Sequence, residues 1–185
     1  MSNAEEDLNL IEAFKNGDET SFNRLVFKYQ QKIYWLALRM TGNHFDAEEV
    51  VQEVLMVMYK KLKGFEFRSS LFSWIYKITS TRSINFINRR KVRESFSIDD
   101  NSFIDLKSED SITDNIETKE KLDKLNKVLQ QLPVKQREVF ILRNFDEMSY
   151  EEISNITGKS VGGLKANYFH AYKKIVELMK EGNDG

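Results

Sequence analysis

The sequence contains no cysteine, a single proline and only two histidines among its 185 residues. Without cysteine, the chain can form neither a disulfide nor a thiolate metal site. Two histidines, with no glycine-rich phosphate-binding loop, leave little from which to build metal-dependent or nucleophilic catalysis. We therefore expect a protein that is not an enzyme, with no catalytic residue, no metal, no cofactor and no small-molecule substrate.

Long apolar runs and a secretory signal are also missing. No stretch approaches the length of a membrane span, and the N-terminus, MSNAEEDLNL, is acidic where a signal peptide would be basic. The lack of cysteine leans toward a reducing compartment. These features together predict a cytoplasmic protein.

Apolar and charged residues dominate what is present. Hydrophobic residues make up 41% of the chain and charged residues 31%, a composition that favours a mostly helical protein when only one proline is present. The formal net charge of -1 hides an uneven distribution. Residues 1–94 hold 15 basic and 12 acidic residues, residues 95–116 hold one and six, and residues 117–185 hold 12 and 11.

The acidic middle segment, SFSIDDNSFIDLKSEDSITDNI, is rich in Ser, Asp and Asn and shows no helical periodicity. This pattern predicts a flexible linker. The segments on either side repeat apolar residues at helical spacing. We therefore predict an all-α fold of two small helical domains, residues 1–94 and 117–185, joined by an acidic linker over residues 95–116.

A helix-turn-helix is predicted in SYEEISNITGKSVGGLKANYFHAYKKI. Ser149 and Glu152 form a capping box at the start of the first helix. Gly158 stands where that helix must end, and Ser160 can cap the second helix. Steps of three and four residues predict one buried apolar stripe on each helix: Ile153 and Ile156 on the first, and Val161, Leu164, Tyr168, Ala171 or Tyr172, and Ile175 on the second. A helical hairpin that only packs against the rest of the protein is the alternative.

The outward face of the second helix favours DNA contact over simple packing. Its first residues are small, and no acidic residue precedes Glu177. Asn can pair with an adenine edge, and lysines can neutralise phosphates. We predict DNA contacts in the major groove from Ser160, Gly162, Gly163, Lys165, Ala166, Asn167, His170 and Lys173.

Two amphipathic helices are predicted in the first domain, one over FNRLVFKYQQKIYWLALRM and one over DAEEVVQEVLMVMYKKL. The second is predicted to begin at Asp46 as its cap and to bury a stripe of Val50, Val54, Met58 and Leu62. Its other face is acidic and polar, with Glu48, Glu49, Gln52 and Glu53. That face is either a solvated surface or a docking site for a basic partner.

The segment from Phe67 to Arg93 has the most unusual local charge, with seven basic residues and no acidic one. Aromatic residues are interleaved with the basic ones. Basic side chains bind the phosphate backbone, and aromatic rings stack on unpaired bases. Part of the segment, including Ile75, Ile78 and Phe86, is expected in the core, and the remainder predicts a surface that holds single-stranded nucleic acid.

Taken together, residues 8–180 resemble an extracytoplasmic-function (ECF) sigma factor of the sigma-70 family of RNA polymerase sigma factors. TGNHFDAEEVVQEVLMVMYKKL resembles the family segment that docks on the clamp helices of the polymerase beta-prime subunit. FRSSLFSWIYKI with NFINRRK resembles the segment that melts and reads the minus-ten promoter element. LNKVLQQLPVKQREVFILRNFDEMSYEEISNITGKSVGGLKANYFHAYKKI resembles the helix-turn-helix that reads the minus-thirty-five element.

The resemblance implies a sigma region 2 helical bundle followed by a region 4 helix-turn-helix. It also implies a transcription initiation factor that binds core RNA polymerase, directs it to specific promoters and helps melt promoter DNA. A stand-alone helix-turn-helix regulator is the alternative, but it leaves the basic and aromatic run unexplained.

The resemblance further implies roles for individual residues. Polymerase contacts fall on Asp46, Glu49, Gln52 and Glu53, and the predicted helix-turn-helix residues read the minus-thirty-five element. A loop from Phe65 to Ser73 captures a base flipped from the non-template strand, and a helix from about Trp74 to Arg93 forms the wall against which melting occurs. Contacts with the single-stranded minus-ten element are implied for Phe65, Phe67, Arg68, Ser69, Trp74, Lys77, Thr81, Arg82, Arg89 and Arg90.

The chain also departs from the family pattern. Thr81 stands where family members commonly have Asn, and Gly163, Ala166 and Asn167 stand where Thr, Ser and Arg are usual. We therefore expect a promoter preference other than the commonest one. The family further implies an anti-sigma partner and a linker that threads toward the polymerase active-centre cleft. A compact free form that masks the DNA-binding surfaces is a further hypothesis.

Overall fold

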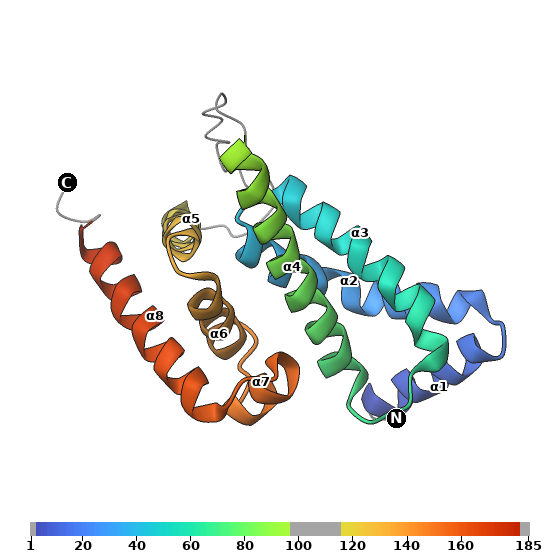
Figure 1. The fold of residues 1–185 in the computed structure, drawn as a ribbon. Coiled ribbons are helices and arrows are strands. Elements are labelled where there is room, and N and C mark those ends of the chain that lie inside the picture. The colour runs from blue at the N-terminus through green and yellow to red at the C-terminus, as the bar shows by residue number, and fades with distance from the viewer. Residues whose placement is uncertain (1–2, 97–115, 182–185) are drawn as a thin grey trace.

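The computed structural model describes residues 3–96 and 116–181 (Figure 1). The described residues fold into eight α-helices and one 3₁₀ turn, without a strand, which confirms the predicted all-α fold. The first domain consists of α1 (Asn3–Lys15), α2 (Glu19–Thr41), α3 (His44–Lys61), η1 (Leu62–Gly64) and α4 (Leu71–Phe96). The second consists of α5 (Ile116–Gln130), α6 (Val134–Asn144), α7 (Tyr150–Thr157) and α8 (Val161–Glu181).

The predicted linker, residues 95–116, lies outside the described residues except at its two ends. Helix α4 continues through residues 95 and 96, and α5 begins at Ile116. The long helix of the first domain also starts earlier than predicted, at Leu71 rather than near Trp74. Its first turn takes up the end of the predicted loop, so the loop proper covers residues 65–70.

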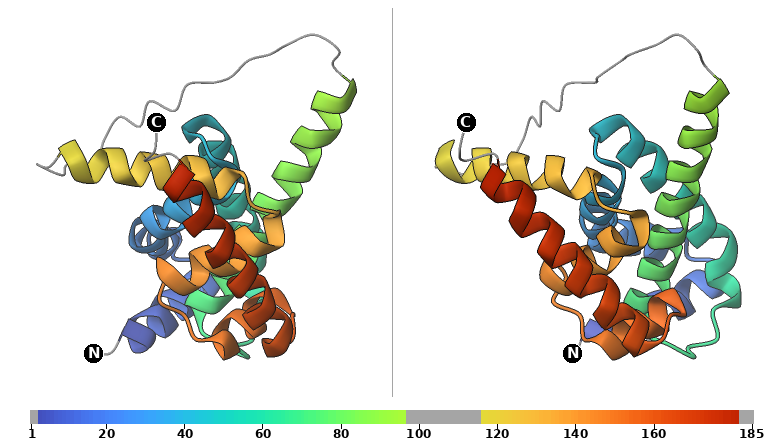
Figure 2. Two further views of the ribbon diagram at one scale, coloured as in Figure 1. Left: turned by 90° about the vertical axis from the view of Figure 1, so that its left-hand side faces the viewer. Right: turned by 60° about the vertical axis from the view of Figure 1, so that its left-hand side comes forward.

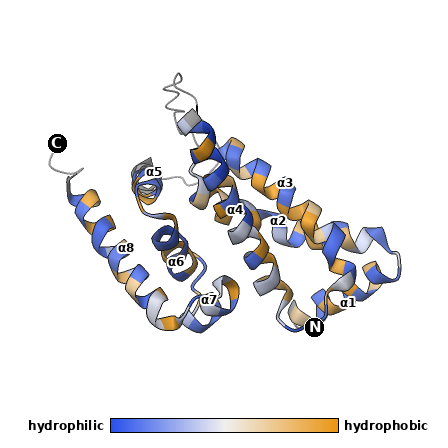
Figure 3. Ribbon diagram, viewed as in Figure 1, coloured by the Kyte–Doolittle hydropathy of each residue, from blue (hydrophilic) through white to orange (hydrophobic). Residues whose placement is uncertain are grey.

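The core of the first domain forms where α2, α3 and α4 pack against one another, and α1 packs against α2 and the η1 turn (Figure 1). The apolar stripe predicted for α3 is fully buried, and α2 buries apolar residues at helical spacing with it: Leu25, Tyr29, Ile33, Leu36 and Met40. Hydrophobic colour in Figure 3 follows the inward sides of these helices, while their outer sides are mostly polar. Helical periodicity alone therefore identified which faces meet.

The start of α3 differs from the prediction. Asn43, not Asp46, is the N-cap, and its side chain accepts a hydrogen bond from the Asp46 amide over 2.9 Å. Asn43 also donates to the Asp46 carboxylate over 2.7 Å. The helix starts earlier because Gly42, at φ 92°, ends α2 in a left-handed conformation and reverses the chain within two residues.

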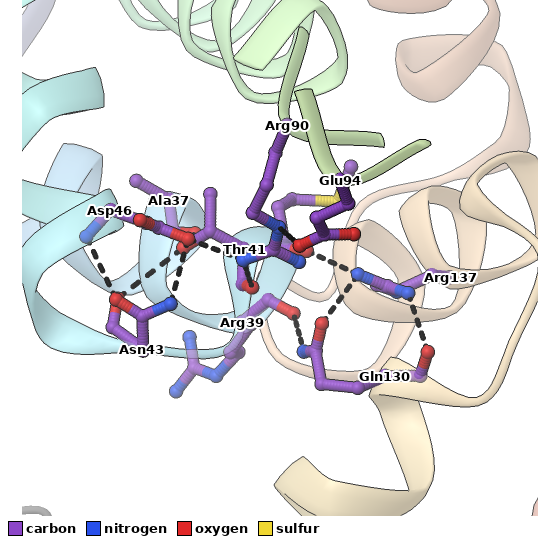
Figure 4. Close-up of polar contacts among 10 residues, drawn as sticks. Ala37, Arg39, Thr41, Asn43, Asp46, Arg90, Glu94, Gln130 and Arg137 are labelled. Atoms are coloured by element: carbon purple, nitrogen blue, oxygen red, sulfur yellow. Dashed lines mark hydrogen bonds and ion pairs between the residues drawn. The ribbon is translucent and has the colours of Figure 1, made fainter. Parts of the chain in front are cut away.

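The two domains pack against each other, and the C-terminal end of α2 is the centre of the contact (Figure 4). The last carbonyl groups of an α-helix have no partner within the helix. Here the Arg137 guanidinium donates to the Met40 carbonyl, and the Gln130 amide donates to the Arg39 carbonyl over 3.0 Å. Arg137 also donates to the Gln130 side chain over 2.6 Å. The second domain thus caps a helix of the first.

Further contacts extend from α4 to α6 and the residues before α7. The Tyr76 hydroxyl donates to Asp146 over 2.8 Å, and the Ser80 hydroxyl donates to the buried carboxylate of Glu138. Lys159 forms an ion pair with the same carboxylate. Apolar side chains of both domains join around this polar network in one buried cluster. The interface between the domains therefore combines apolar packing with hydrogen bonds.

Candidate nucleic-acid interface

Helices α7 and α8 form the predicted helix-turn-helix. Ser149 and Glu152 make the predicted capping box at the start of α7, and Gly158 ends that helix at φ 71°. The Ser160 hydroxyl accepts a hydrogen bond from the Gly163 amide over 3.2 Å, which caps α8. Of the two alternatives on the apolar stripe, Ala171 is buried and Tyr172 is exposed. The residues that begin and end the helices of this motif could be identified directly from the sequence.

The outward face of α8 is open to solvent. Figures 1 and 2 show α8 along the outer side of the second domain, away from α1, α2 and α3. Most of the predicted contact residues are exposed: Ser160, Gly162, Lys165, Ala166, His170 and Lys173. The half-buried Asn167 differs because its amide donates to the Gly163 carbonyl over 2.8 Å. This bond engages one of the two amide N–H donors and orients the side chain, while the Oδ1 acceptor has no part in it.

Sequence reasoning missed one residue on this face. Phe169 has 63% of its surface exposed, and at about 100° per residue it lies within about 60° of Gly162, Ala166 and Lys173 on the outward side. Aromatic residues are enriched at interfaces relative to the rest of a protein surface, which makes Phe169 a candidate contact residue. Its helical position was the signal that could have identified it.

The loop over residues 65–70 opens a pocket of about 460 Å³. Phe65 is buried beneath it, and its ring centroid lies 5.1 Å from that of Phe67 and 5.3 Å from that of Trp74. The structure therefore brings together most of the predicted loop residues, and it adds Lys60 and Lys61 of α3, which the sequence did not indicate. The lining residues are Lys60, Lys61, Gly64, Phe65, Glu66, Arg68, Ser69 and Trp74.

The predicted minus-ten residues along α4 divide into two groups. Lys77 and Thr81 are exposed, and nothing described on the first domain covers them. Three arginines instead pair with acidic residues of α3. Arg89 donates to Glu53 over 2.5 Å, the Arg82 guanidinium lies 3.6 Å from the same carboxylate, and Arg90 pairs with Asp46. Arginines that were predicted to bind DNA thus contact acidic residues that were predicted to bind the polymerase.

These pairs change the character of the α3 face. Its predicted contact residues were Asp46, Glu49, Gln52 and Glu53, but only 19% of the Asp46 side chain and 25% of the Glu53 side chain are exposed. Glu49 retains 56% exposure, and Gln52 is exposed. The face is therefore less acidic toward solvent than the sequence implies, because α4 neutralises part of it.

Beside Gln52 lies a shallow groove between α2 and α3 with a volume of about 650 Å³. Phe27 stands at its edge with 80% of its surface exposed, and Tyr34 is held by a 2.9 Å hydrogen bond between its hydroxyl and His44 Nδ1. This mixture of exposed aromatic and polar groups is typical of a protein-binding surface. The groove is lined by Phe27, Gln30, Gln31, Tyr34, Glu48, Val51 and Gln52.

Burial shifts the pKa of several groups at the contact between the domains. It lowers the pKa of the Arg137 guanidinium to about 10, and the nearby Arg90 charge acts in the same direction. Burial raises the pKa of the Asp146 carboxyl, although the Tyr76 hydroxyl and the Arg39 charge oppose this. These shifts belong to the domain contact, since neither residue lines the pocket or the groove.

Within the described part of the chain, no cluster of three or more metal-binding side chains occurs. None of the helices described there is long and apolar enough to cross a membrane. The surfaces that stand out are instead a recognition-type helix, a small pocket beside basic residues and a partly apolar groove. All three are suited to binding nucleic acid or protein.

Comparison with known proteins accounts for both domains. Residues 25–93 match Sigma-70 region 2, and residues 122–175 match Sigma-70, region 4. The chain is 30% identical over 192 residues to the RNA polymerase sigma-H factor of Pseudomonas aeruginosa, covering 97% of each chain. It is also 30% identical over 182 residues to the ECF RNA polymerase sigma-E factor of Escherichia coli K12, covering 95% of each.

Solved structures are similar in fold. The sigma factor RpoE from Bartonella quintana, crystallised with the anti-sigma factor NepR, is 25% identical, with a TM-score of 0.68 over 86% of this chain and 96% of that one. CnrH, solved with the cytosolic domain of CnrY, has a TM-score of 0.69 at 19% identity, covering 95% and 98%.

A stand-alone helix-turn-helix regulator would account for region 4 but not for region 2, so that alternative is not favoured. The matches extend along almost the whole chain and follow the order of the predicted segments. The chain belongs to the extracytoplasmic-function sigma factors of the sigma-70 family, and it is a transcription initiation factor that directs RNA polymerase to promoters.

Proposed function

We propose that the α2–α3 groove is the surface that docks on the clamp helices of the polymerase beta-prime subunit. The observation that carries this assignment is the exposed Phe27 ring beside exposed Gln52, at the edge of an open groove. Buried aromatic anchors supply much of the affinity of protein interfaces. Glu49 adds exposed negative charge nearby. Asp46 and Glu53 act indirectly, by fixing the arginines of α4.

The pocket beside residues 65–70 is assigned to an unpaired base of the minus-ten element. Aromatic side chains lie in its floor and wall, and Lys60, Lys61 and Arg68 stand around it. Stacking on aromatic rings is sequence-tolerant, and cations close by can neutralise the phosphate backbone. Exposed Lys77 and Thr81 extend the same surface along α4.

The outward face of α8 is assigned to the minus-thirty-five element. Its exposed lysines are suited to phosphates, and Ala166 and Phe169 offer apolar surface of the kind that contacts a thymine methyl group. The face carries lysines but no arginine, so a contact with a guanine edge would have to come from a lysine ammonium group rather than from a guanidinium. This composition supports a promoter preference that differs from that of arginine-bearing relatives.

The proposed mechanism is differential binding rather than bond chemistry, in the cytoplasm. Opening each base-pair step costs about 1.4 kcal/mol of stacking. A pocket that binds only an unpaired base recovers part of this cost and shifts the promoter toward the open state. Two solved structures of similar fold contain partner proteins, one of them an anti-sigma factor. An anti-sigma factor is therefore a proposed partner of this chain too.

Retention of purified bacterial core RNA polymerase on the immobilised protein tests the docking surface. Phe27→Ser combined with Gln52→Ala is expected to reduce retention at least tenfold, which corresponds to about 1.4 kcal/mol. Both residues are exposed, so the fold should tolerate the change. Phe169→Ser is the matched control, because it removes an equally exposed ring from the other domain, and it should retain the polymerase as the wild type does.

Glu53 was also a predicted polymerase contact, but Glu53→Lys would be a poor variant for this test. That change would break the pairs with Arg82 and Arg89 and disturb the packing of α3 on α4. Loss of polymerase binding would then have two explanations. If the Phe27 and Gln52 variant bound polymerase as tightly as the wild type, the groove would not be the docking surface.

A further inference from the structure

Lys15 connects the end of α1 to the loop that forms the base pocket. Its ammonium group donates a 2.7 Å hydrogen bond to the Phe65 carbonyl, 50 residues along the chain. The same nitrogen lies 4.7 Å from the centroid of the Phe67 ring, within the range of a cation–π contact. One side chain therefore holds two successive aromatic positions of the loop.

The loop needs an external restraint because its backbone is strained. Phe67 has φ 57°, a left-handed conformation that bulky residues rarely adopt. Such a conformation persists only where the surroundings determine it, and it is common at functional sites. The Phe67 side chain is 38% exposed, so packing alone does not enclose it. Lys15 supplies a polar contact on one side and a charge over the ring.

Lys15 is itself held in a fixed place. It is the last residue of α1, one position after Phe14, which is fully buried with Leu10 and Ile11. Helix α1 also packs against the turn formed by η1, immediately before the loop. The ammonium group is therefore presented from a rigid element rather than from a mobile tail.

We propose that Lys15 is a positioning residue that keeps the loop over residues 65–70 in the shape that accepts an unpaired base. This inference rests on the proposed assignment of the pocket to such a base. Without Lys15, the Phe65 carbonyl loses its donor and Phe67 can relax from its left-handed conformation. The pocket wall then changes shape, while Lys60 and Lys61 remain available to phosphates.

The predicted consequence is a loss of base selectivity rather than a general loss of affinity. Lys15→Met removes the charge and the hydrogen bond but retains the aliphatic part of the side chain. Lys15→Arg retains both a donor and a cation over the ring, and it should restore wild-type behaviour. Lys63→Met is the matched control. It removes the same charge from the neighbouring turn, where the Lys63 ammonium lies over the Phe14 ring at 5.4 Å.

The test uses the full chain assembled with core RNA polymerase. The probes are single-stranded oligonucleotides with the non-template sequence of a promoter mapped with the wild-type protein, each with one base in turn replaced by an abasic site. At the position that occupies the pocket, the wild type should lose about tenfold in affinity, as expected for one stacked base. Lys15→Met should reduce this penalty to about twofold. Lys15→Arg and Lys63→Met should keep it near tenfold.

Three results would overturn the inference, and they can be told apart. If Lys15→Met kept the tenfold penalty at the same position, the pocket would stand and Lys15 would have no positioning role. If Lys15→Met instead lowered the salt dependence of binding by about 0.7 in log–log slope, Lys15 would be a direct phosphate contact. If no position carried a penalty in the wild type, the pocket assignment itself would fail.

Discussion

At the scale of single residues, buried charged groups are the most informative feature of this protein. Arg137 has 5% of its surface exposed and Glu138 has 2%. Burying a charge costs several kcal/mol unless hydrogen bonds compensate for it. Arg137 meets this need with carbonyl groups from both domains, and Glu138 with Ser80 and Lys159. These residues therefore favour one specific placement of the second domain on the first.

Asp146 gives this contact a pH dependence. Burial raises the pKa of its carboxyl despite the hydrogen bond from Tyr76 and the nearby Arg39 and Lys32 charges. The folded protein thus holds the proton more tightly than the unfolded chain does. The contribution of Asp146 to stability is present in full below its unfolded pKa, and it is lost as the pH rises through its folded pKa.

Asp146→Asn should therefore raise the melting temperature at pH 7, because the amide accepts the Tyr76 hydrogen bond without carrying a buried charge. The gain should shrink as the pH is lowered toward 4. Thermal unfolding of both proteins across this range measures the difference, and Glu177→Gln, which removes an exposed acid from α8, serves as the control. A lower melting temperature for Asp146→Asn at pH 7 would show that attraction to Arg39 outweighs burial.

Phe169 offers a second prediction at this scale. Phe169→Ala should weaken binding of the holoenzyme to its minus-thirty-five duplex about tenfold, in the range of one specific base contact. Tyr172→Ala is the matched control, because Tyr172 is 55% exposed on the same helix but points about 60° away from Phe169. Duplex binding measured with deoxyuridine in place of thymidine identifies a methyl contact. Equal losses for the two variants would contradict a specific role for Phe169.

At the scale of elements, helix ends control where the functional surfaces lie. The cap of α3 by Asn43 fixes Asp46 close to Arg90, and the αL residue Gly158 sets the turn between α7 and α8. Only glycine fits easily at position 42, for two reasons. Its φ is positive, and a Cβ atom there would lie 2.5 Å from the Gln130 side chain. The turn at Gly42 therefore ends α2 and also leaves room for the Gln130 side chain of the second domain.

The capping box of α7 provides a prediction for an element. Ser149→Ala should lower the free energy of unfolding by about 1 kcal/mol, because the Glu152 amide loses its acceptor. It should also weaken duplex binding through α8, since α7 supports that helix. Ser149→Asp retains an acceptor and should behave nearly as the wild type. Chemical denaturation and duplex binding measure the two effects, and unchanged stability of Ser149→Ala would show that the cap is dispensable.

At the scale of the whole molecule, the contact between the domains conflicts with the proposed binding of the minus-ten element by one domain and the minus-thirty-five element by the other at the same time. The names of the two elements place their centres roughly 25 base pairs apart, or about 85 Å at about 3.4 Å per base pair. A compact chain of this length has a radius of gyration of about 16 Å. The packed domains cannot span that distance, so we expect them to separate on the promoter.

The hypothesis of a compact form that masks the DNA-binding surfaces is only partly supported. The domains do pack together, yet the outward face of α8 and the residues around the base pocket stay exposed. The packed arrangement constrains the distance between the surfaces rather than covering either one. The contact combines an apolar cluster with buried charged groups, and these charged groups can be hydrated when the domains part.

Arg137→Met with Gln130→Ala should release the second domain, because together they remove the hydrogen bonds to the carbonyl groups at the end of α2. Small-angle scattering should then show a larger radius of gyration than for the wild type, by several ångströms. Arg143→Met is the matched control on the same helix, since Arg143 bonds to Met148 within its own domain. An unchanged radius of gyration in the double variant would mean that apolar packing alone holds the domains together.

The sequence by itself determined the helices and their buried stripes, because a period of 3.6 residues and local caps such as Ser149 with Glu152 are encoded by residues close together in the chain. Only the tertiary structure decided which distant groups meet. Arg89 reaches Glu53 over 36 residues, and Arg137 reaches the Met40 carbonyl over 97. Periodicity orients a side chain about the axis of its own helix, whereas the packing of one helix on another selects its partner.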